Sequence, residues 1–208
     1  MDYKVTAPGV GAGVIQIQTL TSGAATDRTF LWIPEDAIGE YDMTAEGWFD
    51  ADNWCPVEAL EEPVLFDAGA GFLLMNDYGT GATITYCGAV VAGATELPIL
   101  NRTASVGGNC TPCPIDLTAV TVTAPGVGAG VIQIQTLTPG AATDRTFLWI
   151  PEDEIGEYDM TGEGWFDADN WCPVETLEDP VTFAACEGFL LMNDYGEGAK
   201  IKLPSPLE

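Results

Sequence analysis

Hydrophobic and polar residues alternate at every second position in several short stretches of this chain. The clearest stretch is residues 14–20, Val-Ile-Gln-Ile-Gln-Thr-Leu, and another is residues 28–33, Arg-Thr-Phe-Leu-Trp-Ile, which Pro34 ends. A period of two is typical of a β-strand with one buried face, and β-branched and aromatic residues favour strands. Turn residues separate these stretches roughly every ten positions. The pattern therefore predicts an all-β fold of short antiparallel strands.

This pattern occurs twice. Residues 5–82 return as residues 122–199 with a constant shift of 117 positions, and 68 of the 78 aligned pairs are identical. Repetition at this level predicts two copies of one structural unit. We therefore expect two tandem, nearly identical antiparallel β-sandwich or small-barrel domains, a first repeat at residues 1–90 and a second at residues 122–208.

Three of the ten differences between the copies fall at alternate positions, 65, 67 and 69 against 182, 184 and 186. The intervening Phe66 and Phe183 are the same in both copies. Variation at every second position is expected of a strand with one packed face and one free face. This predicts a strand over residues 64–68, with Phe66 and its equivalent Phe183 facing a core.

The remaining segments predict further short elements. We expect short strands joined by a turn at residues 44–47 in the acidic and aromatic segment 35–54, and one helical turn in the proline-bounded segment 55–63. Residues 71–77 and 82–87 read as a strand, a glycine turn and a returning strand. Residues 91–121, called here the bridging segment, occur only once, and they are apolar enough that we expect them to pack on one repeat or both.

The chain is strongly acidic. It has 6 Lys and Arg against 32 Asp and Glu and no His, for a formal charge of −26. Such a surface repels phosphate backbones, which argues against nucleic acid as a partner, and it disfavours anionic membranes. No apolar run of about 18 residues occurs, so membrane insertion is not expected. The charge fits either solubility in salt or cation binding.

The absence of His removes the usual parts of an active site, including a Ser-His-Asp triad and imidazole metal ligands. We therefore expect no enzymatic activity, no catalytic residues and no bound cofactor except calcium. Tryptophans beside carboxylates, such as Trp48 and Trp54 near Asp50, fit stacking on glycans or a glycosidase acid pair. Buried core tryptophans are the commoner explanation.

One acidic motif has carboxylates spaced like those of a calcium loop, and it is present in both copies. Oxygen clusters of this kind are what hard cations prefer, although position 6, normally Gly, is Cys55 here. A solvated acidic loop competes with this interpretation. The candidate calcium ligands are Asp50, Asp52, Glu58 and Glu61 in the first copy and Asp167, Asp169, Glu175 and Glu178 in the second.

Six cysteines in a chain without His favour an oxidising compartment and disulfides over a metal site. Cys55 and Cys172 are equivalent, but their nearest candidate partners are not, since Cys87 falls opposite Pro204 and Cys186 opposite Gly69. We expect Cys55 to pair with Cys87 and Cys172 with Cys186. Cys110 and Cys113 would then bridge locally or join a neighbouring chain.

Residues 71–90, Gly-Phe-Leu-Leu-Met-Asn-Asp-Tyr-Gly-Thr-Gly-Ala-Thr-Ile-Thr-Tyr-Cys-Gly-Ala-Val, resemble the closing hairpin of secreted β-rich tandem-repeat modules on bacterial cell surfaces. The shared features are a Gly-aromatic-apolar strand, Asn, a glycine turn, alternating Thr and Gly-x-Val. In the second copy the resemblance stops after Ala199. It implies an extracellular or cell-surface structural or adhesive module without catalytic residues.

Two nearly identical domains that pack head to tail leave one unfilled contact at each end. Repeated between chains, such a heterologous contact builds a fibre or tube, or closes into a ring. Strand edges at residues 3–5 or 201–203 are expected to accept a neighbour by strand addition. The sequence therefore favours a self-assembling extracellular structural protein whose partner is itself. The alternative is an adhesion or carbohydrate-binding module that gains avidity for glycans from two copies.

Overall fold

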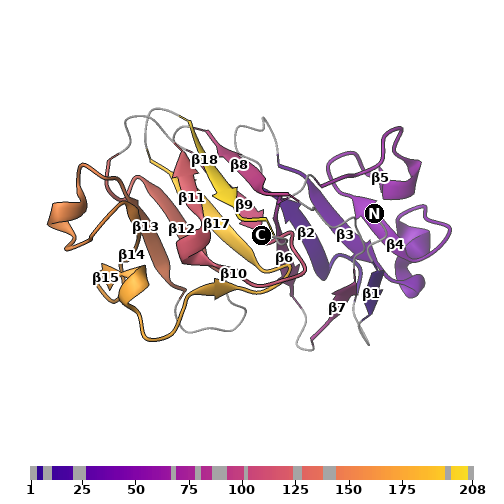
Figure 1. The fold of residues 1–208 in the computed structure, drawn as a ribbon. Helices are drawn as coiled ribbons and strands as arrows, with labels where there is room; N and C mark the ends of the chain where they lie inside the picture. Colours follow the sequence, from indigo (N-terminus) through magenta and orange to yellow (C-terminus); the bar gives the residue numbers. More distant parts are fainter. Residues whose placement is uncertain are drawn as a thin grey trace. The chain divides into compact units, whose positions relative to one another are not determined.

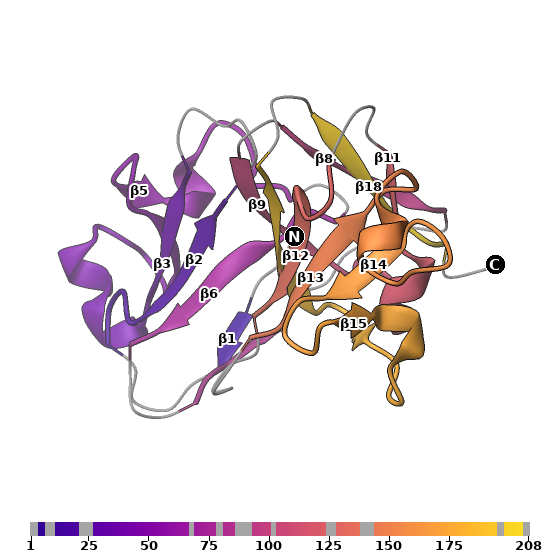
Figure 2. The same ribbon diagram turned by 90° about the vertical axis from the view of Figure 1, so that its left-hand side faces the viewer.

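The structure is a computed structural model, and it describes residues 4–6, 11–20, 27–66, 69–77, 81–85, 93–100, 103–123, 128–137, 144–194 and 198–205. Figures 1 and 2 show the fold in two views. The chain divides into two compact units. The first contains Met1–Leu20, Ala24–Asp67 and Phe72–Ala89, and the second contains Thr21–Gly23, Ala68–Gly71 and Val90–Glu208.

The first unit has two antiparallel sheets in its described residues. One has the strand order β5-β4-β3-β2-β6, and the other pairs β1 with β7. Two 3-10 helices lie between the strands. The elements are β1 (Lys4–Thr6), β2 (Ile15–Thr19), β3 (Thr29–Ile33), η1 (Glu35–Glu40), β4 (Gly47–Asp50), β5 (Cys55–Pro56), η2 (Val57–Ala59), β6 (Phe72–Asn76) and β7 (Thr83–Thr85).

The second unit has three antiparallel sheets in its described residues, with the orders β15-β14-β13-β12-β17-β9, β11-β18-β8 and β10-β16. The bridging segment supplies β8 (Thr95–Ile99), β9 (Thr103–Gly108), β10 (Ile115–Asp116) and η3 (Leu117–Ala119). The other elements are β11 (Thr121–Thr123), β12 (Ile132–Thr136), β13 (Thr146–Ile150), η4 (Ile155–Glu157), β14 (Gly164–Asp167), β15 (Cys172–Pro173), η5 (Val174–Thr176), β16 (Thr182–Phe183), β17 (Gly188–Asn193) and β18 (Ala199–Leu203). The predicted all-β class is confirmed.

Strands at equivalent positions of the two copies pair in the same register. β2 pairs with β3 through Ile17 and Phe30, and β12 pairs with β13 through Ile134 and Phe147, which are the residues 117 positions later. The pairings of β1 with β7 and of β11 with β18 obey the same shift. Identical alternating sequences thus form the same local sheet in each copy.

The bridging segment adds one strand to each sheet of the second unit. β9 pairs with β17 along its whole length, β8 pairs with β18, and β10 pairs with β16. The first unit has no such additional strands in its described residues, so β6 and β7 each pair with a single strand there. The two copies therefore share the same local strand pairing, but the bridging segment pairs with the strands of the second copy.

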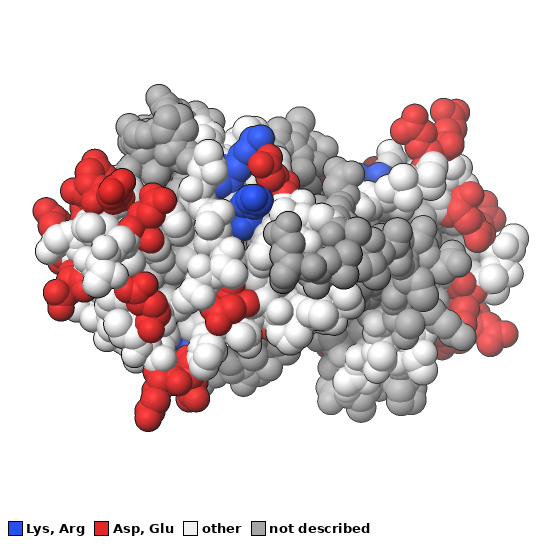
Figure 3. Space-filling view, in the orientation of Figure 1, with Lys and Arg blue, Asp and Glu red and all other residues white. Residues whose placement is uncertain are grey.

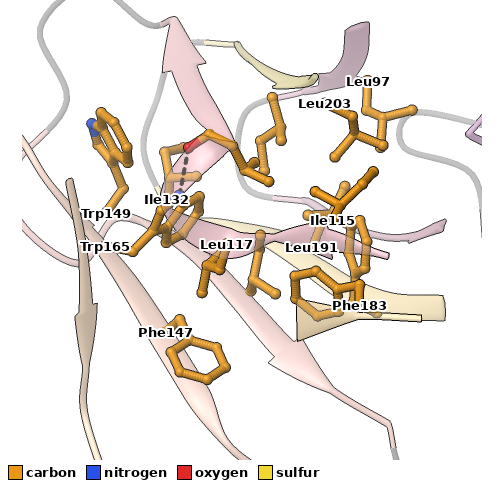
Figure 4. Close-up of a cluster of buried hydrophobic side chains, with 14 of the residues drawn as sticks. Leu97, Ile115, Leu117, Ile132, Phe147, Trp149, Trp165, Phe183, Leu191 and Leu203 are labelled. Carbon is orange, nitrogen blue, oxygen red and sulfur yellow. Dashed lines mark hydrogen bonds between the residues drawn. The ribbon is translucent and has the colours of Figure 1, made fainter. Parts of the chain in front are cut away.

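The largest core cluster of the second unit is built from its three sheets and from the bridging segment (Figure 4). Leu97, Ile115 and Leu117 of the bridging segment meet side chains of the repeat such as Ile132 and Leu191. The Trp165 indole N–H donates to the carbonyl oxygen of Val120 at 2.8 Å, the bond drawn dashed in Figure 4. This bond satisfies the polar atom of a buried Trp, so the ring fits the core.

The structure corrects two predicted strands. Residues 35–40 form η1 instead of a strand, because Pro34 ends β3 and its carbonyl oxygen accepts a bond from the Ala37 N–H at 3.0 Å, which starts a 3-10 turn. Residues 64–66 are not in a strand, whereas the equivalent β16 is one. β16 pairs with β10, and no described strand pairs with residues 64–66. The predicted helical turn is confirmed in η2 and η5.

Residues 201–203, predicted as an exposed edge, lie in β18, which is the central strand of its sheet between β11 and β8. Ile201 and Leu203 are fully buried. The prediction was wrong because the bridging segment pairs with this strand. In the part of the chain that the structure describes, no helix is long and apolar enough to cross a membrane.

Candidate functional site

Each copy holds an Arg–Asp clasp at the end of its β3–β4 or β13–β14 pair. In the first copy the carboxylate of Asp50 is completely buried and accepts bonds from the Asp52 N–H at 2.9 Å and the Asn53 N–H at 3.0 Å. Its Oδ2 accepts from Asn53 Nδ2 at 2.9 Å and from the Arg28 guanidinium. The guanidinium also lies over the Phe30 ring, 4.9 Å from its centroid. These bonds fix the loop that follows β4.

The second clasp repeats this geometry with Asp167, Asn170 and Arg145. In both clasps, burial alone would raise the pKa of the carboxyl, but the hydrogen bonds from the Asn and from the Arg outweigh it. The pKa of Asp50 and that of Asp167 therefore lie below the ordinary value. Both carboxylates are thus held ionised as structural acceptors.

The predicted calcium ligands are not gathered into one site. Asp52 uses Oδ2 to accept the Thr29 N–H at 2.7 Å, while Glu58 and Glu61 are exposed. In the second copy Asp169 accepts the Thr146 N–H at 2.8 Å, and Glu175 accepts from the Thr161 hydroxyl at 3.2 Å. Glu178 is exposed. Across the described residues no three acidic or Cys side chains converge as a metal site would require.

An exposed tryptophan follows each clasp. Trp54 and Trp171 each have 69% of their surface exposed, and each has a positive φ of 53° and 54° respectively. A bulky residue with positive φ is uncommon and stores strain. The Trp54 ring rests against Phe49 at 5.2 Å and Tyr41 at 6.1 Å, and Trp171 has the equivalent neighbours. The chain therefore presents the same outward aromatic side chain twice.

The cysteine pairings differ from those predicted. Cys172 and Cys186 are both free, because β15 and β17 are separated in their sheet by three intervening strands, farther apart than a disulfide allows. Cys110 and Cys113 form no local disulfide either, and the Cys110 sulfur lies 3.4 Å from the Thr95 hydroxyl. The predicted partner of Cys55, Cys87, lies outside the described residues. A bridge between chains is still a prediction.

The largest difference between the copies is the exposure of identical side chains. Leu74 in β6 is 55% exposed, whereas its equivalent Leu191 in β17 is 1% exposed. The neighbouring Phe72 is half-buried, whereas Phe189 is completely buried. We call the side of β6 and β7 that carries Phe72, Leu74 and Ile84 the open face. Fully burying one such side chain stabilises a protein by about 1.5 to 3 kcal/mol, so exposing Leu74 has an energetic cost.

In the second unit the equivalent face is covered by the bridging segment. β8 presents Thr95, Leu97 and Ile99 inward while Glu96 and Pro98 point outward. Val106, Ile115 and Leu117 are also buried. The bridging segment therefore completes the core that the repeat alone leaves uncovered. The sequence predicted that this segment packs on one repeat or both, but it did not indicate which.

Most of the charged side chains that Figure 3 shows on this face are Asp or Glu, and few are Lys or Arg. One exposed ion pair joins Lys200 in β18 to Glu96 in β8 at 2.9 Å, and it lowers the pKa of Glu96. The equivalent of Lys200 in β7 is Thr83. An exposed ion pair of this kind contributes little to stability. It is nevertheless a contact between β8 and β18 that a Thr at the position of Lys200 could not make.

Comparison of the chain with protein-family models, with curated proteins and with solved structures found no match. The resemblance of residues 71–90 to bacterial surface modules therefore remains a prediction. The geometry described above is what carries the functional proposals.

Proposed function

We propose that this protein is a non-enzymatic, self-assembling extracellular structural protein, a subunit of a fibre, tube or surface layer. Its two copies are proposed to be β-sandwich-like domains that join head to tail. Duplication supports this because a surface present twice in one chain can be used both within a molecule and between molecules.

The open face is the single observation that carries the proposal. Leu74 is 55% exposed in the first unit, whereas its equivalent Leu191 is 1% exposed in the second. An exposed apolar side chain in a sheet is characteristic of an interaction surface when it forms part of a larger apolar patch. Each chain carries one bridging segment for two repeats, and among the described residues this segment pairs with the second repeat.

Charge sets the conditions for assembly. A formal charge of −26 opposes contact between copies at neutral pH. Salt screens this repulsion over distances of about 8 to 10 Å at ordinary ionic strength, and mild acidification neutralises part of it. We therefore expect assembly to increase with salt, with calcium and with a moderate fall in pH.

The test follows light scattering of the purified protein against concentration, at low and high salt, with and without calcium, and at several pH values. Negative-stain microscopy of the same samples shows the form of any assembly. Scattering that rises with salt and yields uniform fibres, tubes or sheets supports the proposal. A monomer at every concentration and in every condition would contradict it.

The exposed tryptophans favour a second candidate function, glycan binding by an adhesion module. Aromatic rings that project from two equivalent positions can stack on sugars and provide avidity. Glycans should then change the tryptophan fluorescence, and the double variant Trp54→Ala and Trp171→Ala should lose the response. Each single variant should keep a weaker response, since one platform remains. An unchanged spectrum across a glycan panel would exclude this function.

A further inference from the structure

We propose that Cys113 and Cys186 form an oxidisable thiol pair, and that its oxidation joins the bridging segment covalently to the second repeat. Both residues are free thiols in the structure, and both are exposed. The inference goes beyond the proposed function and does not depend on it, because it concerns a modification within one chain. It applies to a monomer as well as to an assembly.

The two cysteines lie at the same end of a two-stranded sheet. β10 pairs with β16 in the antiparallel sense, with Ile115 opposite Phe183. Cys113 lies two residues before Ile115, and Cys186 lies three residues after Phe183. In an antiparallel pair, the start of one strand lies beside the end of its partner. The sheet therefore brings these two cysteines together, although they are distant in the sequence.

One buried side chain binds the backbone of both cysteines. Asn109 is 1% exposed, and its Nδ2 donates to the carbonyl oxygen of Cys113 at 2.8 Å and to that of Ala184 at 3.0 Å. The carbonyl oxygen of Asn109 accepts the Cys186 N–H at 2.9 Å. Because one fixed residue binds both backbones, the thiols are held near each other before any bond forms. Closing the remaining gap requires an adjustment of the two loops.

Cys186 occupies a position at which the first repeat has glycine. The Glu187 N–H donates to the carbonyl oxygen of Ala184 at 3.0 Å, which closes a β-turn with Cys186 in its third position. The φ of Cys186 is 67°, and that of the equivalent Gly69 is 78°. A residue with a side chain is strained at such a φ, whereas glycine is not. The second repeat therefore carries this thiol at an energetic cost, which is typical of a functional position.

Cys110 is a third cysteine at this corner, but its sulfur is engaged elsewhere. It lies two residues after Gly108, which pairs with Gly188. Its sulfur lies 3.4 Å from the Thr95 hydroxyl, and it is less exposed than Cys113. Oxidation requires access of the oxidant to the thiol, so Cys113 is the favoured partner. We therefore expect Cys110 to stay reduced.

The reaction is a thiol–disulfide exchange with a small-molecule disulfide. One protein thiolate attacks the small disulfide and forms a mixed disulfide, and one small thiol leaves. The second protein thiolate then displaces the other small thiol, and the S–S bond forms between Cys113 and Cys186. The protein pair loses two electrons and two protons, which the small disulfide takes up as it becomes two thiols. The new bond restricts the unfolded chain and so stabilises the second unit.

The experiment incubates the full chain with oxidised glutathione, maps the disulfides by mass spectrometry and follows thermal unfolding by calorimetry. We expect a bond between Cys113 and Cys186, and a rise of about 5 to 10 °C in the unfolding temperature of the second unit. Cys186→Gly should lose both the bond and the rise. This variant should still fold, because glycine is the residue at the equivalent position 69. Cys110→Ser is the matched control and should keep both.

A bond between Cys110 and Cys186, a bond between two chains, or no bond to Cys186 would overturn the proposal. A temperature rise that persists in Cys186→Gly would also overturn it, because another pair would then be the cause. The proposed assembly is tested separately by light scattering, so either proposal can fail while the other stands.

Discussion

At the scale of single residues, the acidic character of the chain has two different meanings. Most carboxylates lie on the surface and repel one another, whereas Asp50 and Asp167 are buried acceptors that organise loops. The sequence motif suggested calcium for both because spacing alone does not show which carboxylate faces a backbone N–H. Arg28 and Arg145, each 22 residues before its partner, donate hydrogen bonds to these carboxylates. The carboxylates therefore act as structural acceptors.

Acid should weaken the fold through these two carboxylates. Their pKa is lower in the folded protein than the value of about 3.9 in an unfolded chain, so their stabilisation is present above that value and is lost as pH falls through the folded pKa. Urea unfolding between pH 7 and pH 2 measures it. The double variant Asp50→Asn and Asp167→Asn should be less stable at pH 7, by about 2 to 3 kcal/mol for each site.

Between about pH 4 and about pH 2, a range that includes the unfolded-state pKa of about 3.9, the free energy of unfolding of the same double variant should fall less than that of the natural chain. Asp36→Asn with Asp153→Asn is the matched control, because these two equivalent residues are exposed. If the two double variants gave parallel pH profiles, the clasps would not contribute to the acid dependence.

At the scale of elements, alternation was a reliable guide where both neighbours of a strand come from the same repeat. β2, β3 and β6 were predicted correctly, with boundaries displaced by at most one residue. Prediction failed where the partner is distant in sequence. β16 forms because β10 pairs with it, and residues 64–66 of almost the same sequence do not form a strand. The exposure of Leu74 could not be predicted either, because identical sequences predict identical burial.

The bridging segment should therefore be essential to the second unit and not to the first. Ile99 in β8 is completely buried, so Ile99→Ala should reduce the free energy of unfolding of the second unit by about 3 kcal/mol. Leu100→Ala is the control, because Leu100 is 46% exposed and should change stability by less than about 1 kcal/mol. Hydrogen exchange at β12 and β17 measures the change, while exchange at β2 and β3 should not respond.

At the scale of the whole molecule, two units with nearly the same repeat should differ in stability. The second unit has a large core cluster in which its three sheets and the bridging segment take part, and a small cluster around Phe166. The described residues of the first unit form two smaller clusters, around Trp32 and around Phe49. Buried apolar area is the main source of folding free energy, so the first unit should be the weaker one.

Heating should open the two units in sequence. We expect hydrogen exchange to reach β2 and β3 before β12 and β13, and calorimetry to show more than one transition. Adding a second copy of residues 93–120 directly before Lys4, the residue equivalent to Thr121, should raise the stability of the first unit and bring the transitions together. A single cooperative transition in the natural chain would mean that the two units do not differ in this way.

The presence of one bridging segment and two nearly identical repeats also affects how the chain reaches its native state. A refolding molecule must choose between two nearly degenerate docking sites for the same piece of sheet, and the wrong choice is a kinetic trap. Lys200 and Lys202, which replace Thr83 and Thr85, are among the few residues that break this degeneracy, since Lys200 attracts Glu96. The Lys200–Glu96 pair is thus one weak contact that favours docking of the bridging segment on the second unit.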